Sequence, residues 1–334
     1  MLLSIIIVNY KSAELISECL QSARNFASFN DFEWIVVDNQ SNDNSKAVIT
    51  SKFPNVIWVD MGYNAGFSRA NNEGMRMAKG EVFLLLNPDT IILEDAINKC
   101  LNKFIPSAHI ACGVQILNKD MTNQISGSYF MKGGINHLLP LPYYGSLLKR
   151  ISSLLNVKKP SVEKANEEQL VEWISGAYLM VKKRVLKNTS LMNEDFFLYA
   201  EEIEWCSRLA CNGSLCIYGD IHIIHLVGET ITASANSDDK SYTNLFDKKG
   251  GQLILSNHLR IRKQYGIAWF LFQLLNYTLA TPFFFIGSFI DHLIHFTNPF
   301  QDFKKALGLA SNVKLVWAHL FIIIRNKPHF YKVL

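Results

Sequence analysis

Two groups of acidic and amide side chains in the sequence are suited to metal or acid–base chemistry. The segment Asn87-Pro88-Asp89-Thr90 directly follows the most hydrophobic run of the N-terminal half. Asn-Pro and Asp-Thr are favoured in turns, so a plain turn is one interpretation. In the other, Asp89 holds a divalent cation, since a hard cation bound to carboxylate and phosphate oxygens neutralises a phosphate leaving group.

The second group lies more than a hundred residues further on, in residues 196–209. Acids cluster there as they do in the first turn of a helix, where the macrodipole favours them. We expect Glu204 to pair with Arg208 at i,i+4 spacing. Apolar and aromatic residues precede Glu201 and Glu202, so at least one of these carboxylates should meet a partly desolvated wall. Desolvation would raise its pKa toward the range of a general base. His225, a single histidine after an apolar run, fits a buried structural residue when taken alone.

These side chains need a scaffold, and the first hundred residues predict one. Four continuous apolar runs, typical of strands covered on both faces, each end in a polar residue. The runs are residues 5–8, 34–37, 56–59 and 82–86. Between the first two, Ser12 is a plausible N-cap, and an apolar stripe from Ile16 to Ala27 predicts a helix.

Alternating strands and helices indicate an open α/β sheet with right-handed crossovers, in which ligands bind beyond the carboxyl ends of the strands. The expected strand ends carry polar side chains, which predicts a polar crevice there. These residues are Asn9, Tyr10, Asp38, Asn39, Asn87 and Asp89.

Several classes of protein are excluded. The turn after the first run lacks GxGxxG, and no GxxxxGK[ST] loop occurs, which argues against the usual dinucleotide and P-loop folds. The net charge of +4 over 334 residues is too small to indicate nucleic-acid binding. The six cysteines form no CxxC pair and are expected to be reduced and mostly buried. Residues 1–8 have no basic n-region and are expected to form a strand, not a signal peptide.

Taken together, the motifs resemble family 2 glycosyltransferases of the GT-A fold, in the rhamnosyltransferase-like branch. The resemblance covers about residues 2–266 and consists of an ordered series of short motifs. The series is residues 7–10, 36–39 with Ser41 and Ser45, 64–74, 86–90, 173–177, 196–209 and 224–225. It implies a Rossmann-like, mixed and mostly parallel sheet flanked by helices, followed by a C-terminal hydrophobic helical extension.

The resemblance also implies roles for individual residues on the donor side. Asp38 matches the aspartate that reads the nucleotide base, with Asn9 and Tyr10 in the same nucleotide-sugar pocket. Asn64 and Arg69 belong to a loop and helix that close over the donor, where Gly66 would let the backbone approach the diphosphate.

At the reaction centre, Asn87 and Asp89 match the DxD motif, with Asn87 contacting the nucleotide and Asp89 binding Mg²⁺ or Mn²⁺. His225 would complete the metal site, although the residues after it, 226–228, depart from the family's His-Gly-Gly. Glu202 stands where the family has the aspartate that acts as catalytic base, and Glu201 is the fallback base.

These roles imply an inverting, metal-dependent transfer of a hexosyl, rhamnosyl-like unit from a nucleotide-diphosphate sugar to a saccharide acceptor, lipid-linked in many relatives, during synthesis of surface polysaccharide. Two alternatives remain open. One is a polyprenyl-phosphate sugar transferase of the same fold. The other is a non-catalytic, membrane-anchored nucleotide-sugar-binding subunit, which the glutamate at position 202 favours.

The C-terminal region has a different character. Residues 264–290 carry no charged side chain, but Pro282 is expected to divide them into two pieces, each too short to span a bilayer. A kinked span, a re-entrant hairpin and an interfacial pair of helices therefore all stay open. From His258 onward there are nine Lys/Arg and two Asp/Glu, which fits an anionic cytoplasmic leaflet.

We therefore expect a glycosyltransferase domain at residues 1–235, split into a nucleotide-sugar half (1–116) and an acceptor and base half (117–235). A helical, membrane-associated region (236–334) would follow, on the cytoplasmic side of the inner or plasma membrane. Acceptor specificity is expected to lie in residues 118–169.

Overall fold

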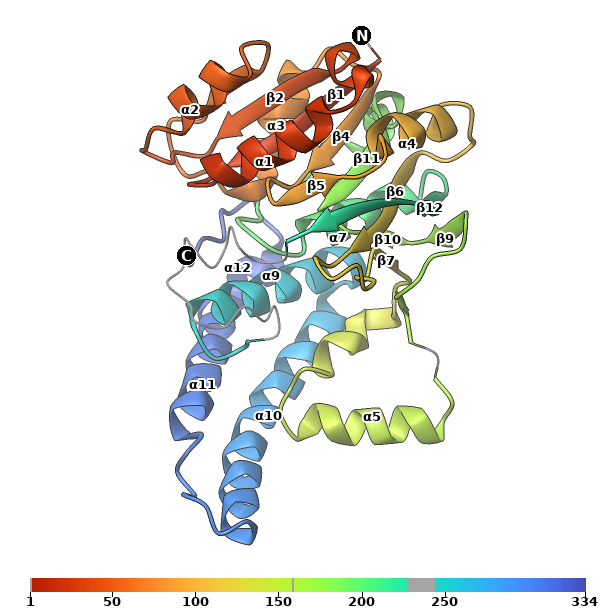
Figure 1. Ribbon diagram of the computed structural model, residues 1–334. Coiled ribbons are helices and arrows are strands. Elements are labelled where there is room, and N and C mark those ends of the chain that lie inside the picture. The colour runs from red at the N-terminus through yellow and green to blue at the C-terminus, as the bar shows by residue number, and fades with distance from the viewer. Residues whose placement is uncertain (1, 158, 227–243) are drawn as a thin grey trace. The chain divides into compact units, whose positions relative to one another are not determined.

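The computed structural model describes residues 2–157, 159–226 and 244–334 (Figure 1). The chain divides into two compact units. The first comprises Met1–Tyr129, Ser161–Phe197 and Glu201–Lys240, and the second comprises Phe130–Pro160, Leu198–Ala200 and Ser241–Leu334. The domain boundary expected at residue 235 lies outside the described residues.

A mixed nine-stranded sheet forms the centre of the first unit, in the order β3-β2-β1-β4-β11-β6-β12-β5, with β9 paired to β12. Pairing is parallel from β3 to β4 and between β6 and β12, whereas β5, β9 and β11 run antiparallel to their neighbours. The expected α/β fold, a mixed sheet flanked by helices, is confirmed. The strands are β1 Leu3–Asn9, β2 Glu33–Asp38, β3 Ile57–Asp60, β4 Val82–Leu86, β5 Thr90–Ile92, β6 Ala111–Leu117, β9 Gln169–Val171, β11 Tyr178–Lys182 and β12 Leu215–His225.

The four predicted strands form, but one of them differs in burial. β4 is buried along its whole length, and in β1 and β2 only the last residue of β2, Asp38, is not fully buried, as their continuous apolar runs predicted. β3 is only partly buried, so the prediction that it is covered on both faces was wrong. It is the edge strand of the sheet, and its run of four residues was too short to distinguish an edge from a centre.

Helices cover both faces of this sheet. The buried side of α1 (Ala13–Arg24) belongs to the same core cluster as Ile5 and Ile7 of β1. Gly74 of α3 (Gly66–Met77) packs on Ile6, the residue between them, because a Cβ at Gly74 would lie 2.4 Å from its Cγ2. Successive strand residues point to opposite faces, so α1 and α3 flank the sheet on opposite sides. The predicted stripe fails at its end: α1 stops at Arg24, and Ala27 is exposed at the start of a 3₁₀ turn.

The remaining elements of the first unit are shorter. They are α2 Ser45–Lys52, α4 Ala96–Phe104, α6 Leu186–Thr189, α7 Glu201–Ala210, the 3₁₀ turns η1 Ala27–Asp31 and η3 Lys183–Val185, and a three-stranded sheet of β7 Gly127–Ser128, β8 Ser161–Val162 and β10 Trp173–Ile174. All six cysteines are free thiols, and five are buried.

The second unit is helical. Its elements are η2 Lys132–Leu138, α5 Tyr144–Leu154, α9 Lys248–Tyr265, α10 Ile267–Ile294, α11 Phe303–Ala318 and α12 Leu320–Arg325. The prediction that Pro282 divides the apolar run was wrong, because α10 continues through it. A proline inside a helix costs about 3 kcal/mol. Close to the proline, the ring of Phe284 stacks on Phe246 at 5.4 Å, and an aromatic pair of this kind contributes about 1 kcal/mol toward offsetting the cost.

Candidate functional site

A network of short hydrogen bonds joins the carboxyl ends of β1 and β2. The side-chain amide of Asn9 donates to Oδ1 of Asp38 at 2.7 Å, and the Ser41 hydroxyl donates to the same oxygen at 2.6 Å. The backbone N–H of Ser41 donates to the other oxygen, Oδ2, at 3.1 Å. These three hydrogen bonds hold the Asp38 carboxylate in one orientation. Because Asp38 is only partly buried, one edge of the carboxylate stays accessible. The neighbouring Tyr10 ring lies 5.6 Å from the ammonium of Lys11.

The loop before α3 is tied to the end of β2. Nδ2 of Asn39 donates to Asn64 at 3.1 Å, and Oδ1 of Asn39 accepts from the backbone N–H of Ala65 at 2.7 Å. Gly66 has a φ of +76°, and a Cβ there would lie 2.3 Å from the carbonyl oxygen of Phe197, so only glycine fits. In this structure the backbone next to Gly66 is that of Phe197, and the close approach of Gly66 to a diphosphate stays a prediction.

Asn87, Asp89 and His225 meet where β5 pairs with the end of β12. Asp89 and His225 are 4% and 7% exposed. Oδ1 of Asp89 and Nδ2 of Asn87 each lie 3.3 Å from Nε2 of His225. The backbone N–H of Leu226 donates to the carbonyl of Asp89 at 2.8 Å, which locks the turn onto the strand. Residues 87–90 are thus a turn, as one interpretation held, and the turn contains a buried carboxylate.

Gln124 fixes the orientation of the His225 ring. Its amide donates to the carbonyl of His225 at 2.7 Å, and its Oε1 lies 3.3 Å from Nδ1 of the ring. A glutamine Oε1 only accepts hydrogen bonds, so the proton belongs on Nδ1. Nε2 then carries a lone pair, which accepts from the amide of Asn87. An imidazole that binds a metal through one nitrogen uses this tautomer.

These residues fit a divalent cation. A lone pair and a carboxylate oxygen 3.3 Å apart repel each other unless a positive charge lies near both. Oδ1 of Asp89 is buried and makes no hydrogen bond. Within the described ranges, no group of three or more His, Cys, Asp and Glu could hold a metal. Asp89 and His225 would therefore supply two ligands, and phosphate oxygens and water would supply the others.

Cys19 lies close to this turn without joining it. Its sulfur is 3.3 Å from the hydroxyl of Thr90. Burial raises the pKa of Cys19 to about 12, and the Asp89 carboxylate acts in the same direction, whereas the hydrogen bond to Thr90 opposes it. The group therefore stays a neutral thiol at physiological pH and is a poor metal ligand.

The backbone of residues 176–177 connects the Asn87 turn to Glu202. The N–H of Asn87 donates to the carbonyl of Ala177 at 3.1 Å. Beside it, a Cβ at Gly176 would lie 3.4 Å from Cγ of Glu202, in ordinary van der Waals contact. Asn87 and Glu202, 115 positions apart, thus contact adjacent residues of one short segment. Glu202 is partly buried and Glu201 is buried.

The backbone before the two acids is strained. Tyr199 and Ala200 both have positive φ, 71° and 66°, directly before α7 begins at Glu201. A non-glycine residue in this region costs about 1–2 kcal/mol, and consecutive examples are typical of functional sites. Of the apolar residues before the acids, Phe196 and Phe197 are buried, and the contact of a carboxylate with an apolar wall stays a prediction. The raised pKa expected for Glu201 or Glu202 stays a prediction.

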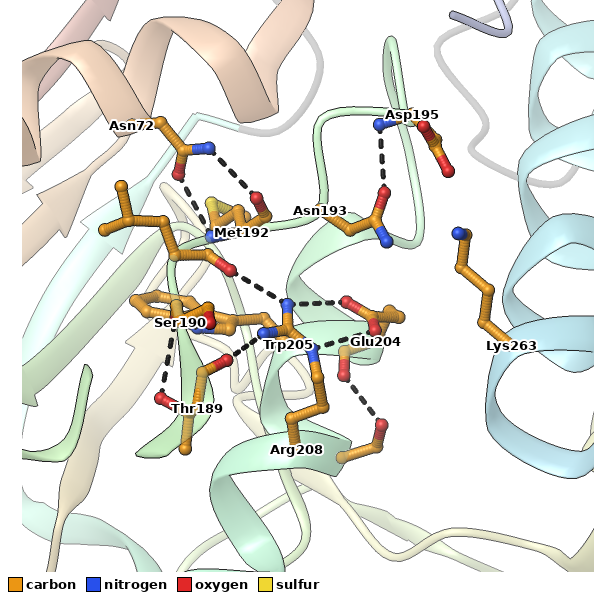
Figure 2. Close-up of polar contacts among 12 residues, drawn as sticks. Asn72, Thr189, Ser190, Met192, Asn193, Asp195, Glu204, Trp205, Arg208 and Lys263 are labelled. Atoms are coloured by element: carbon orange, nitrogen blue, oxygen red, sulfur yellow. Dashed lines mark hydrogen bonds and ion pairs between the residues drawn. The ribbon is translucent and has the colours of Figure 1, made fainter. Parts of the chain in front are cut away.

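Figure 2 shows how α7 holds the loop that precedes these residues. Arg208 makes the predicted pair with Glu204, with a 2.8 Å contact to Oε2 and a 2.9 Å hydrogen bond to Oε1. The guanidinium also donates to the carbonyls of Thr189 and Leu191, and the indole N–H of Trp205 donates to the carbonyl of Ser190 at 3.1 Å.

From α3, Asn72 exchanges two hydrogen bonds with the backbone of Met192, at 2.9 and 3.0 Å (Figure 2). Arg69 donates through Nε to the carbonyl of Glu194 at 3.1 Å. The helix expected to close over the donor is thus also tied to the loop that leads to the acids.

The structure therefore brings most of the predicted site residues into three contacting sets, all in the first unit. Asn9 lies with Asp38; Asn64 lies with the N-terminus of α3; and Asn87, Asp89 and His225 lie beside the segment that contacts Glu202. Sequence reasoning missed Gln124, because a single glutamine in the poorly patterned stretch 118–169 gives no motif.

Comparison with known proteins adds independent information. The family model "Glycosyl transferase family 2" matches residues 4–164. The "Low-salt glycan biosynthesis hexosyltransferase Agl10" of Haloferax volcanii is 30% identical over 211 residues, 62% of this chain and 61% of that protein. The "Rhamnosyltransferase WbbL" of Escherichia coli is 24% identical over 231 residues, 66% of this chain and 82% of that protein. The chain thus spans about 61% of the length of the archaeal relative.

Among solved structures, the mannosyltransferase PcManGT from Pyrobaculum calidifontis, in complex with GDP-Man and Mn²⁺, superposes with a TM-score of 0.53. The two are 14% identical, and the match covers 95% of this chain and 87% of the other. At this identity the likeness supports the GT-A fold alone.

Proposed function

We propose that this chain, which the glycosyl transferase family 2 model matches over residues 4–164, transfers a hexosyl, rhamnosyl-like unit from a nucleotide-diphosphate sugar to a saccharide acceptor, with inversion at the anomeric carbon. The observation that carries the proposal is the contact between Asp89 and His225. A buried carboxylate oxygen without a hydrogen bond lies 3.3 Å from Nε2 of the His225 ring. The pair is suited to the cation that a nucleotide diphosphate brings with it.

On the donor side, the proposal assigns the nucleotide to the ends of β1 and β2. Asp38, fixed by Asn9 and Ser41, would accept hydrogen bonds from the base, beside the ring of Tyr10. Asn64, Arg69 and Asn87 would contact the rest of the donor. When bound, Mg²⁺ or Mn²⁺ supplies charge neutralisation for the departing diphosphate.

On the acceptor side, Glu202 would remove the proton from the attacking hydroxyl, and the buried Glu201 is the fallback base. Glu202 lies against Gly176, next to the residue that holds the Asn87 turn. A base facing the sugar across from the diphosphate suits a single in-line displacement. Among the described site residues, we assign no side chain as the nucleophile that a double displacement would need.

The cellular role is part of the same proposal. The relative from Haloferax volcanii bears a glycan-biosynthesis name, and α10 is the one helix of the described residues that is long and apolar enough to cross a membrane. We assign the protein to the cytoplasmic face of the inner or plasma membrane. There it would act on a lipid-linked saccharide in the synthesis of cell-envelope polysaccharide.

The test is a Glu202→Gln variant assayed for nucleotide-diphosphate release and sugar transfer. Transfer should fall by at least a hundredfold, as is typical when a general base is lost, while the thermal shift given by donor and Mn²⁺ is retained. Glu94→Gln, which changes an exposed acid, is the matched control and should transfer at the wild-type rate. Wild-type transfer by Glu202→Gln would show that another group is the base.

The same assay separates the two alternatives. Glu202 is one methylene longer than the aspartate expected there, which favours a binding subunit; such a protein would release no nucleotide diphosphate with any acceptor. A polyprenyl-phosphate sugar transferase would glycosylate free polyprenyl phosphate in preference to a saccharide, and it would depend less on Glu202 because its acceptor is already anionic.

A further inference from the structure

The two units carry opposite charge. In the sequence of the first unit there are 17 Lys/Arg and 26 Asp/Glu, whereas the second unit has 16 Lys/Arg and only 3 Asp/Glu. The net charges are thus −9 and +13. The second unit contains a long hairpin formed by α10 and α11. Its exposed basic side chains include Lys149 and Arg150 of α5 and Lys304, Lys305 and Lys314 of α11. An excess of this size favours contact with an anionic surface.

Helix α5 presents an apolar stripe that the protein does not cover. Leu147, Ile151 and Leu154 recur at helical spacing and are all exposed, with Leu154 at 83%. Of the eleven residues of α5, only Gly145 is buried. Lys149 lies about 200° around the helix from Leu147, on the opposite side. Arg150 lies about 60° from Leu147, at the border of the stripe. A helix with an exposed apolar stripe and basic residues at its border and on its opposite side is typical of an interfacial helix.

Helix α10 also has an exposed apolar stripe, which is longer than that of α5. One side of it is buried, through Phe270, Leu274, Tyr277 and Phe284. The other side carries large apolar residues that recur every three or four positions and are exposed along more than five turns. They are Leu275, Leu279, Phe283, Ile286, Ile290 and Leu293.

The two helices are neighbours in the second unit (Figure 1). The ring of Tyr143, just before α5, lies 6.2 Å from that of Phe284, and its hydroxyl donates to Asp291 at 3.5 Å.

Packing within the unit argues against a spanning α10. His258 of α9 contacts the rings of Phe270 and Tyr277, at 6.1 and 4.9 Å, so the first three turns of α10 are held against a helix rich in Arg and Lys. Residues 278–294 remain beyond it, about 26 Å of helix, against a hydrocarbon core of about 30 Å.

The far end of the hairpin is polar. Asp302 accepts from Ser288 at 3.1 Å and pairs with Lys305 at 2.9 Å. The chain returns along α10, where the indole of Trp317 donates to Thr278 at 3.0 Å. A spanning hairpin would also have to bring the exposed Lys314, in the last third of α11, toward the bilayer, which is costly for a charged side chain.

We propose that the exposed apolar stripes of α5 and α10 form a membrane-docking surface that lies in the headgroup region of an anionic bilayer, parallel to its plane, without crossing it. The stripes enter the boundary between headgroups and acyl chains, while the surrounding lysines and arginines contact lipid phosphates. The inference rests on the proposed function only because that function places the protein at a membrane. Docking itself requires no catalysis.

The first test is co-sedimentation of the detergent-free protein with vesicles of 70% phosphatidylcholine and 30% phosphatidylglycerol, and with pure phosphatidylcholine. Binding to the anionic vesicles should be at least tenfold stronger and should weaken with salt. The double variant Leu154→Asp, Phe283→Asp should lose at least tenfold in binding. Met121→Asp, which changes a similarly exposed apolar residue (57%) in the first unit, should bind like wild type.

The second test distinguishes docking from spanning. Asn298, in the exposed turn after α10, is replaced by Cys in a Cys211→Ser background, since Cys211 is the exposed native cysteine. With protein added outside sealed vesicles, a membrane-impermeant maleimide should label Cys at 298 fully. Protection of this position would show that the hairpin crosses and would overturn the proposal.

Two further outcomes would also overturn it. One is equal binding by the double variant and wild type. The other is a concentration-dependent dimer without vesicle binding, which would identify a second copy of the chain as the occupant. Nucleotide-diphosphate release, measured on the same samples without vesicles, reports on the proposed function separately. If the protein binds vesicles but releases no nucleotide diphosphate, the membrane-docking proposal stands and the proposed function is refuted.

Discussion

Replacing Gln124 by Met tests the most specific feature of the candidate metal site. The substitution roughly preserves side-chain volume but removes the 3.3 Å contact to Nδ1 of His225 and the 2.7 Å bond to its carbonyl. Only the contact to Nδ1 orients the ring, so at about 1 kcal/mol for a neutral hydrogen bond the substitution should cost about fivefold in Mn²⁺ affinity. Loss of an outer partner of a metal-binding histidine typically costs 10–100-fold.

The assay is a titration with Mn²⁺ in the presence of a nucleoside diphosphate, following free Mn²⁺ by its paramagnetic resonance signal. Long-range ¹H–¹⁵N spectra of the histidine rings report whether Nδ1 of His225 still carries the proton. Gln301→Met, at an exposed glutamine of the second unit, is the control. If Gln124→Met binds Mn²⁺ within twofold of wild type while His225→Ala is weakened tenfold, Gln124 does not position the ring. If His225→Ala also binds normally, His225 is not a ligand.

Two further predictions concern stability. Gly66→Ala should lower the free energy of unfolding by more than about 2 kcal/mol, because the new methyl meets the Phe197 carbonyl in a left-handed backbone conformation; Gly62→Ala, with positive φ but open space around it, should cost only about 1 kcal/mol in urea denaturation. Burial lowers the pKa of His258 to about 4. Below pH 6.5, His258 therefore binds a proton in the unfolded chain but not in the folded chain. Its contribution to stability is complete above pH 6.5 and is lost as the pH falls toward 4. Between pH 7.5 and 5 this loss is about 2 kcal/mol; a His258→Phe variant should lack that part of the pH dependence, and an unchanged slope would contradict the assignment.

The strands could be predicted from sequence because their signal is local. Residues 5–8 and 82–86 are continuous apolar runs with polar ends, and the chain has few other ways to bury them. The errors arose where tertiary context decides. β3 has the composition of a central strand but occupies the edge of the sheet. Pro282 has the properties of a helix breaker, yet packing keeps α10 continuous through it.

The candidate site was predictable only in its motifs. Asp38 is the last residue of β2 and Asp89 comes shortly after β4, so the sheet itself brings them to one edge. His225 reaches Asp89 because β12 pairs antiparallel with β5, a long-range register that no local pattern encodes. Gln124 has no motif at all; its role follows from two atoms that happen to face the same ring.

The backbone directly before the two acids bears on how they are positioned. Leu198–Ala200 belong to the second unit, although Phe197 and Glu201 on either side belong to the first. The carbonyl of Leu198 accepts from Ser256 of α9 at 2.7 Å. Tyr199 and Ala200 follow with positive φ, so the two residues directly before Glu201 have an unfavourable backbone conformation. Such strain persists only when surrounding contacts over-determine it.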